Sequence, residues 1–195
     1  KSSDFLAEFL KEKKIEMVFG IIGSGNAHIF DSIHQLGFTK IIPFHHEQAA
    51  IMAMIAYFRI TGKVAASLLT TGAGTSNGVT GVVNAYMDSI PGLIISGNEN
   101  SKFTTSENPL RIWGVQGYDS VESAKTFTKH AYRLMEGESV MLQFDFAYQV
   151  AMHGRPGPVW IDVPMNIQGQ KVEEERVKEE HLKVEWNQRY GHYPI

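Results

Sequence analysis

The 195-residue sequence predicts an α/β fold: a doubly wound, mostly parallel sheet of six strands flanked by helices. The first observation behind this prediction is the regular alternation of short apolar runs with segments whose apolar residues recur at helical spacing. The second is that most apolar runs are uninterrupted, as expected for strands that helices cover on both faces. The third is the composition, 43% hydrophobic and 20% charged, which suffices for one substantial core.

The first half of the chain supplies four of these strands. They are expected over residues 17–22, 40–45, 64–70 and 92–97. The helices before and between them are expected over residues 3–13, 27–37, 47–62 and 75–89.

Local signals define the ends of these helices. Ser3 or Asp4 is expected to cap the start of the first helix, and Gly37 is a suitable C-cap for the second. The helix over residues 47–62 is apolar on most sides, so we expect it to be buried. The helix over residues 75–89 is rich in small residues, which suits close packing.

The second half begins with a long irregular stretch, residues 98–118, in which aromatic and polar residues are mixed. A loop of this length in a compact domain is usually functional. Alternation then resumes, with helices expected over residues 119–125 and 138–153 and strands over residues 131–135 and 157–164.

The end of the chain differs in composition, because residues 170–195 are dense in charge and poor in apolar side chains. We therefore predict one domain over residues 1–168. We expect residues 169–195 to form a charged, solvated and partly helical linker or tail that leads toward further domains.

Composition also excludes several classes of function. The net charge of −3 gives no electrostatic reason to expect a nucleic acid or an anionic membrane as a partner. The absence of cysteine excludes a disulfide scaffold, thiol catalysis and a cysteine-based zinc site. No apolar run is long enough to span a bilayer and no signal peptide opens the chain, so we expect a cytoplasmic protein.

Three junctions between a strand and a helix carry residues that could bind a ligand: residues 23–26, 45–48 and 70–77. The first, Gly-Ser-Gly-Asn, only partly matches a dinucleotide fingerprint, because His28 stands at the third glycine position and no acidic residue ends the second strand. The third lacks the Gly-Lys-Ser/Thr of a P-loop. It is either an anion-accepting turn or a turn that permits close packing.

The middle junction contains His45, His46 and Glu47. Adjacent histidines on a strand point to opposite faces, so they are unsuited to share one metal ion, and we predict no metal site here. A glutamate at the start of a helix can simply interact favourably with the helix dipole. His45 has no predicted role beyond solvent or interface contact.

Five separated motifs resemble the pyrimidine-binding domain of thiamine-diphosphate-dependent enzymes, and most closely that of the acetolactate synthase group. They are "VFGIIGSGN" (18–26), "HEQAA" (46–50), "TTGAGTSNGVTGVVNAYMDSIP" (70–91), Gln116 followed by "TKHAY" (128–132), and "GRPGPVWIDVP" (154–164). Their order and spacing match the family over about residues 4–168.

The resemblance implies that Glu47 is catalytic: in the family this glutamate hydrogen-bonds N1′ of the aminopyrimidine ring of the cofactor and so promotes loss of the thiazolium C2 proton. It also implies that the cofactor-binding residues are Ile22, Gly23, Glu47, Thr71, Gly74, Asn77 and Gln116. In the chain alone, Glu47 is expected to be an unpaired carboxyl group at the floor of a cleft.

The implied activity is decarboxylation of a 2-keto acid such as pyruvate and transfer of the two-carbon unit to an acceptor. Family members bind Mg²⁺ and the diphosphate through a separate domain with a Gly-Asp-Gly…Asn motif, and this motif is absent from the 195 residues. We therefore expect the first domain of a longer enzyme, or one subunit of a split enzyme. Its expected partners are the diphosphate-binding domain of a partner subunit and further copies of itself, in a dimer or tetramer.

Departures from the family pattern leave the substrate open. The first turn has Ile22-Gly23 where the family often has Pro-Gly, and the third has Gly72-Ala73-Gly74 in place of Gly-Pro-Gly. "FGIIGS" resembles sulfoacetaldehyde acetyltransferases, and a simple 2-keto acid decarboxylase or a sugar-branching enzyme are further alternatives. Outside these enzymes, the alternatives are a non-catalytic cofactor-binding subunit and a flavodoxin-like nucleotide binder that uses residues 23–26.

Overall fold

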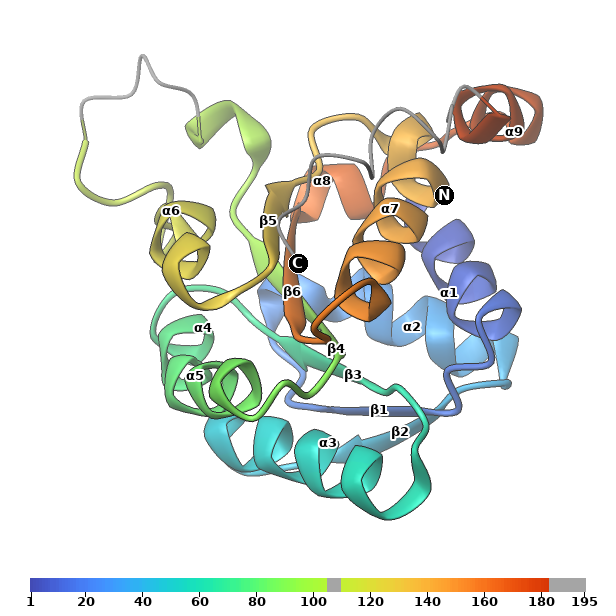
Figure 1. The fold of residues 1–195 in the computed structure, drawn as a ribbon. Coiled ribbons are helices and arrows are strands. Elements are labelled where there is room, and N and C mark those ends of the chain that lie inside the picture. The colour runs from blue at the N-terminus through green and yellow to red at the C-terminus, as the bar shows by residue number, and fades with distance from the viewer. Residues whose placement is uncertain (105–109, 183–195) are drawn as a thin grey trace.

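A computed structural model of the protein describes residues 1–104 and 110–182 and shows a six-stranded sheet (Figure 1). The strands are Met17–Gly20 (β1), Lys40–Pro43 (β2), Ala66–Leu69 (β3), Gly92–Asn98 (β4), His130–Arg133 (β5) and Pro158–Pro164 (β6). Their order is β2-β1-β3-β4-β6-β5, and each pair of neighbours is parallel. The predicted doubly wound α/β fold is confirmed.

Helices cover both faces of the sheet (Figure 1). The larger ones are Ser2–Glu12 (α1), Ala27–Leu36 (α2), Glu47–Thr61 (α3), Val79–Met87 (α5), Val140–Met152 (α7) and Glu174–Leu182 (α9). Shorter ones are Ala73–Asn77 (α4), Ser120–Ala124 (α6) and Met165–Gln168 (α8), with 3₁₀ turns at Ser24–Asn26, Ser101–Phe103, Lys125–Phe127 and Gly137–Ser139. None of the helices in the two described ranges is long and apolar enough to cross a membrane.

Two apolar cores lie on opposite faces of the sheet. One packs α1, α2 and α7 against the sheet around side chains such as Phe9 and Phe144, whose ring centroids are 5.6 Å apart. The other packs α3, α5 and α6 against the sheet, with Ile51, Met54 and Trp160 at its centre. Coverage on both faces explains why the strands read as uninterrupted apolar runs.

The strand order locates the candidate site. The chain leaves β1 toward β2 at one edge and then returns to β3 on the other side of β1. The loops that follow β1 and β3 therefore leave in opposite directions, and ligands of open parallel sheets bind at such a switch point, beyond the carboxyl ends of the strands.

The helices differ from the sequence predictions in three places. The predicted helix over residues 75–89 begins at Ala73 and is interrupted at Gly78, where an added Cβ would lie 2.8 Å from the Leu69 side chain. The first helix begins at Ser2, with Lys1 rather than Ser3 or Asp4 at the N-cap position. α3 is buried on one face only, and Ile60 is 85% exposed, so the prediction of burial on most sides was wrong.

The charged end of the chain contains a helix over Glu174–Leu182, as expected, and the rest of it from residue 183 lies outside the described residues. Val177 is buried within the core that also holds α7. His181 Nε2 lies 3.1 Å from Asp145 Oδ2 on α7. This helix therefore packs on the domain, and the linker beyond it stays a prediction.

His130 makes the stability of the chain depend on pH. Burial beside Phe146 and Tyr132 lowers the pKa of His130 to about 4, and its Nε2 has no hydrogen-bond partner within residues 1–104 and 110–182. The unfolded chain takes up this proton near pH 6.5 and the folded chain only near the lowered pKa. Stability is therefore lost as pH falls through this window, by about 2–3 kcal/mol at pH 4.5.

Urea unfolding of the 195-residue chain at pH 7 and pH 4.5 measures this effect. His130→Gln should reduce the difference between the two pH values by about that amount. His34→Gln, at an exposed position on α2, is the matched control and should leave the difference unchanged. The same pH dependence in wild type and His130→Gln would contradict the prediction.

Candidate functional site

The three predicted junctions meet at the switch point between β1 and β3. Gly23 lies against Thr70, so that a Cβ on Gly23 would be 2.3 Å from Thr70 Oγ1. Gly74 faces Thr70 and Glu47, and a Cβ there would be 2.6 Å from Thr70 Cγ2 and 2.8 Å from Glu47 Oε1. Neither Gly23 nor Gly74 adopts a positive φ, so it is the close approach of neighbouring atoms that demands glycine.

Glu47 is the buried acid at this junction. It is the first residue of α3, and the ring nitrogen Nδ1 of His46 accepts a hydrogen bond from Gln48 N (3.2 Å) to cap the helix. The Glu47 side chain is 7% exposed, and its Oε2 accepts a hydrogen bond from Asn77 Nδ2 (3.1 Å). The expectation of an unpaired carboxyl was therefore wrong, because α4 brings an amide to it.

The second oxygen of Glu47, Oε1, accepts no hydrogen bond from the described residues. A buried carboxylate usually satisfies both oxygens, so Oε1 is available to a donor on a ligand. The position at the start of α3 also places the charge where the helix dipole favours it. Glu47 can therefore both stabilise the start of α3 and bind a ligand through Oε1.

The turn after β1 is stabilised by its own side chains. Asn26 is fully buried; its Oδ1 accepts from Gly23 N (2.8 Å), and its Nδ2 donates to the carbonyl of Ile21 (3.0 Å). Since the Gly23 N–H is engaged within the turn, it is not free for a phosphate, which disfavours the flavodoxin-like alternative. The neighbouring Ile22 side chain is 63% exposed and free to contact a ligand.

The histidines beside Glu47 lie in the bend between β2 and α3, where both are exposed, rather than on the strand. The argument that they point to opposite faces of a strand therefore does not apply. His46 has a structural role as the cap of α3, while His45 makes no hydrogen bond or ion pair with its side chain in the described part of the chain.

A pocket of about 430 Å³ opens between α4 and the end of the irregular stretch. It is lined by Gly72, Ala73, Ser76, Arg111, Ile112, Val115, Gln116, Gly117 and Tyr118. Its walls are mainly apolar, and Arg111 is the charged member of this lining. Gln116 packs on Gly72, where φ is +64° and a Cβ would lie 2.7 Å from Gln116 Cβ.

The seven residues predicted to bind the cofactor therefore fall into three groups. In the first group, Gly74 and Asn77 contact the buried carboxylate of Glu47, Gly23 packs on the same Thr70 as Gly74, and the exposed Ile22 precedes Gly23 in the chain. Gln116 lines the pocket on the other face of α4. Thr71 is buried and donates from Oγ1 to Asn98 Oδ1 (3.4 Å), so its hydroxyl faces the interior.

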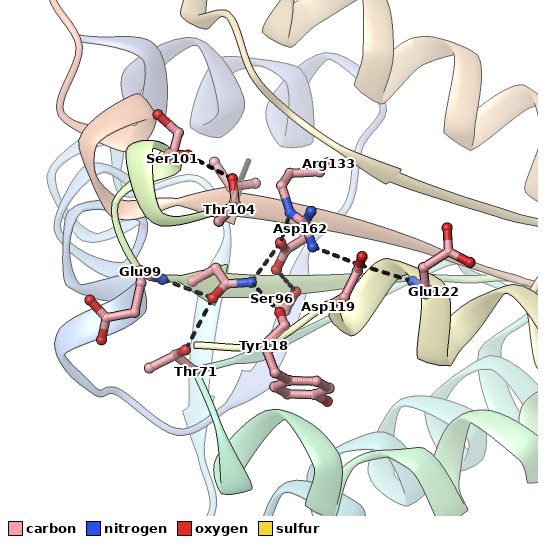
Figure 2. Close-up of polar contacts among 12 residues, drawn as sticks. Thr71, Ser96, Glu99, Ser101, Thr104, Tyr118, Asp119, Glu122, Arg133 and Asp162 are labelled. Atoms are coloured by element: carbon pink, nitrogen blue, oxygen red, sulfur yellow. Dashed lines mark hydrogen bonds and ion pairs between the residues drawn. The ribbon is translucent and has the colours of Figure 1, made fainter. Parts of the chain in front are cut away.

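Sequence reasoning missed a polar network next to this site (Figure 2). Asp162, at the end of β6, is fully buried and accepts hydrogen bonds from Ser96 Oγ (2.6 Å), Asn98 Nδ2 (2.8 Å) and Arg133 Nε (2.7 Å). Burial raises the pKa of Asp162, although Arg133 and the hydrogen bonds oppose this effect. Charged residues inside two predicted apolar strands, Asp162 and Arg133, were the available signal.

Comparisons with known proteins identify the class. The family described as "Thiamine pyrophosphate enzyme, N-terminal TPP binding domain" matches residues 1–123. The chain therefore belongs to the family of N-terminal, thiamine pyrophosphate-binding domains of thiamine pyrophosphate enzymes.

Within that class, the relatives of this chain include acetolactate synthases. The chain is 35% identical over 162 residues to the acetolactate synthase large subunit of Haemophilus influenzae, which covers 83% of this chain and 27% of the relative. It is 34% identical over 174 residues to that of Lactococcus lactis, covering 88% of this chain and 29% of the relative. The chain thus spans less than a third of the length of these relatives and is acetolactate synthase-like.

Asn77 offers a direct test of the pairing with Glu47. Asn77→Asp removes the hydrogen bond and places a second carboxylate beside the buried one, so we expect a loss of about 1–2 kcal/mol at pH 7.

Denaturant unfolding at pH 7 measures this loss. Ser76→Asp is the matched control, because Ser76 is exposed on the same helix and its hydroxyl donates to the carbonyl of Ala73 (3.0 Å) rather than to Glu47. Equal losses in the two variants would show that Asn77 does not pair with Glu47.

Proposed function

We propose that this chain is the cofactor-activating domain of a thiamine-diphosphate-dependent enzyme that decarboxylates a 2-keto acid, such as pyruvate, and transfers the two-carbon unit to an acceptor. The observation that carries the proposal is Glu47, a buried carboxylate with one free oxygen at the switch point of the sheet. Family membership supports thiamine diphosphate as the cofactor.

The residues present fit the pyrimidine end of this cofactor. Oε1 of Glu47 has no donor among the described residues, and a protonated ring nitrogen would supply one. A Cβ on Gly74 would clash with Thr70 and Glu47, and a Cβ on Gly23 would clash with Thr70. Glycine at both positions therefore keeps the backbone of the two turns close together around the site. Gln116 and the apolar pocket adjoin α4 on its other face, where the reacting end of the cofactor and the substrate would be enclosed.

When bound, thiamine diphosphate supplies an acidic carbon that attacks the keto group and an electron sink for decarboxylation. The protein supplies the environment. Glu47 would hold the proton at the ring nitrogen through Oε1, while Asn77 fixes the orientation of the carboxylate through Oε2. Ile112, Val115 and Tyr118 would exclude water, and the guanidinium of Arg111 would attract the carboxylate of the substrate.

The complete active site requires parts outside this chain. We propose that a second domain binds Mg²⁺ and the diphosphate, and that this domain belongs to a partner subunit in a homodimer or tetramer. The small share of the relatives that this chain covers supports a longer enzyme. The acceptor, and hence the choice among acetolactate synthase-like reactions, depends on those parts.

Glu47→Gln in the full-length enzyme tests the catalytic role. The amide cannot hold the proton, so turnover of pyruvate should fall by at least about 100-fold while the circular dichroism spectrum and the melting temperature stay close to those of wild type. Glu8→Gln, on the exposed side of α1, is the control and should keep wild-type turnover. Unchanged turnover in Glu47→Gln would refute the role and favour a non-catalytic cofactor-binding subunit.

Calorimetric titration of the isolated 195-residue chain tests the proposal of a half-site. Without a diphosphate-binding domain, thiamine diphosphate should bind more weakly than about 100 μM, with or without Mg²⁺, and the chain should show no turnover. Tight binding that depends on Mg²⁺ would contradict the division of the site between two domains.

A further inference from the structure

Arg133 contacts both the buried end of β6 and the pocket loop, which we define as residues 110–119. Its Nε donates to Asp162 Oδ2 (2.7 Å), and an NH2 group donates to Asp119 Oδ1 (2.9 Å). Its guanidinium carbon also lies 4.7 Å from the ring centroid of Trp113. Figure 2 shows Arg133 between the carboxylates of Asp162 and Asp119. One side chain therefore connects the sheet to the end of the pocket loop and to its middle.

Trp113 transmits this contact to the pocket. Trp113 and Gly117 form a pair of backbone hydrogen bonds, with N···O distances of 2.9 and 2.7 Å, that close a tight turn. Gly114 has a φ of +61°, as such a turn requires. Gln116 lies within this turn and packs on Gly72 at the start of α4. Fixing Trp113 therefore fixes the wall of the pocket that carries Gln116.

The same network holds the base of the loop. Asn98 Nδ2 donates both to Asp162 Oδ2 (2.8 Å) and to the carbonyl of Tyr118 (3.1 Å). Asp119 in turn caps α6 by accepting from Glu122 N (3.2 Å). The anchoring contacts therefore converge on Asp162, whose buried charge depends on Arg133 for compensation.

We propose that Arg133 is a positioning residue for the pocket: it holds the turn over residues 113–117, and with it Gln116, in the arrangement that receives the substrate. The functional part of this inference rests on the proposed function. A lysine could neutralise Asp162, but it lacks the planar group that serves two carboxylates and an aromatic face together. If Arg133 served only to neutralise Asp162, its contacts with Asp119 and Trp113 would be unnecessary.

Two variants separate these roles. Trp113→Leu removes the aromatic contact and leaves the Arg133–Asp162 pair in place. The buried charge of Asp162 stays compensated in this variant, so we expect it to fold. Arg133→Lys keeps the positive charge and loses the shared geometry. Arg155→Lys is the matched control, since Arg155 also makes hydrogen bonds, to Ser89 Oγ (2.6 Å) and the carbonyl of Met87 (3.3 Å), at a place away from the pocket loop.

Hydrogen exchange of the backbone amides of residues 113–118 measures the anchoring without any ligand. We expect exchange there to be about tenfold faster in Trp113→Leu and Arg133→Lys, with β6 unchanged in Trp113→Leu and no change in Arg155→Lys. Unchanged exchange in both variants, or equal acceleration in β6, would overturn the anchoring.

A double-mutant cycle in the full-length enzyme measures the functional part. Gln116→Ala should raise KM for pyruvate severalfold in the wild-type background and much less in the Trp113→Leu background, because the glutamine is already displaced. Independent, multiplicative effects would overturn the positioning role. If the wild-type enzyme does not turn over 2-keto acids, the proposed function fails, while the exchange measurement still decides the anchoring.

Discussion

The buried carboxylate of Asp162 is the constraint on which the arrangement around the pocket depends. A charge without access to water must be neutralised and hydrogen-bonded, because its desolvation is otherwise prohibitive. Asp162 lies on β6 and the groups that satisfy it come from β4 and β5, while Trp160 Nε1 on β6 donates to Ser96 Oγ (2.9 Å). Three strands are thus held in one register at the edge where the loops of the site begin.

Glu47 presents the opposite case at the same edge of the sheet. It is nearly as buried as Asp162 but receives a single hydrogen bond, from Asn77, and has no cation beside it among the described residues. An incompletely satisfied carboxylate costs stability in the absence of a ligand. Asp162 therefore stabilises the framework, whereas Glu47 can still accept a hydrogen bond from a donor outside the chain.

Much of the fold was predictable from local pattern. The apolar runs from "MVFGII" to "GPVWIDVP" predicted the six strands, because the inner strands such as β3, β4 and β6 are covered on both faces and so carry a continuous apolar signal. The errors concern packing. The sequence around Ile60 is as apolar as a buried helix, but one face of α3 has no neighbour among the described residues. The segment predicted as one helix over residues 75–89 is instead divided at Gly78 into α4 and α5.

By itself, the sequence determined the fold class, the junctions at residues 23–26, 45–48 and 70–77, and Glu47 as the candidate acid. These features depend on local periodicity and on residues that are adjacent along the chain. Tertiary structure alone decided that Asn77 reaches Glu47 and that Thr71 faces inward. It also decided that Arg133 joins Asp162 to Trp113 and Asp119. These contacts join residues far apart in sequence, and they depend on the order of the strands in the sheet, which no local pattern encodes.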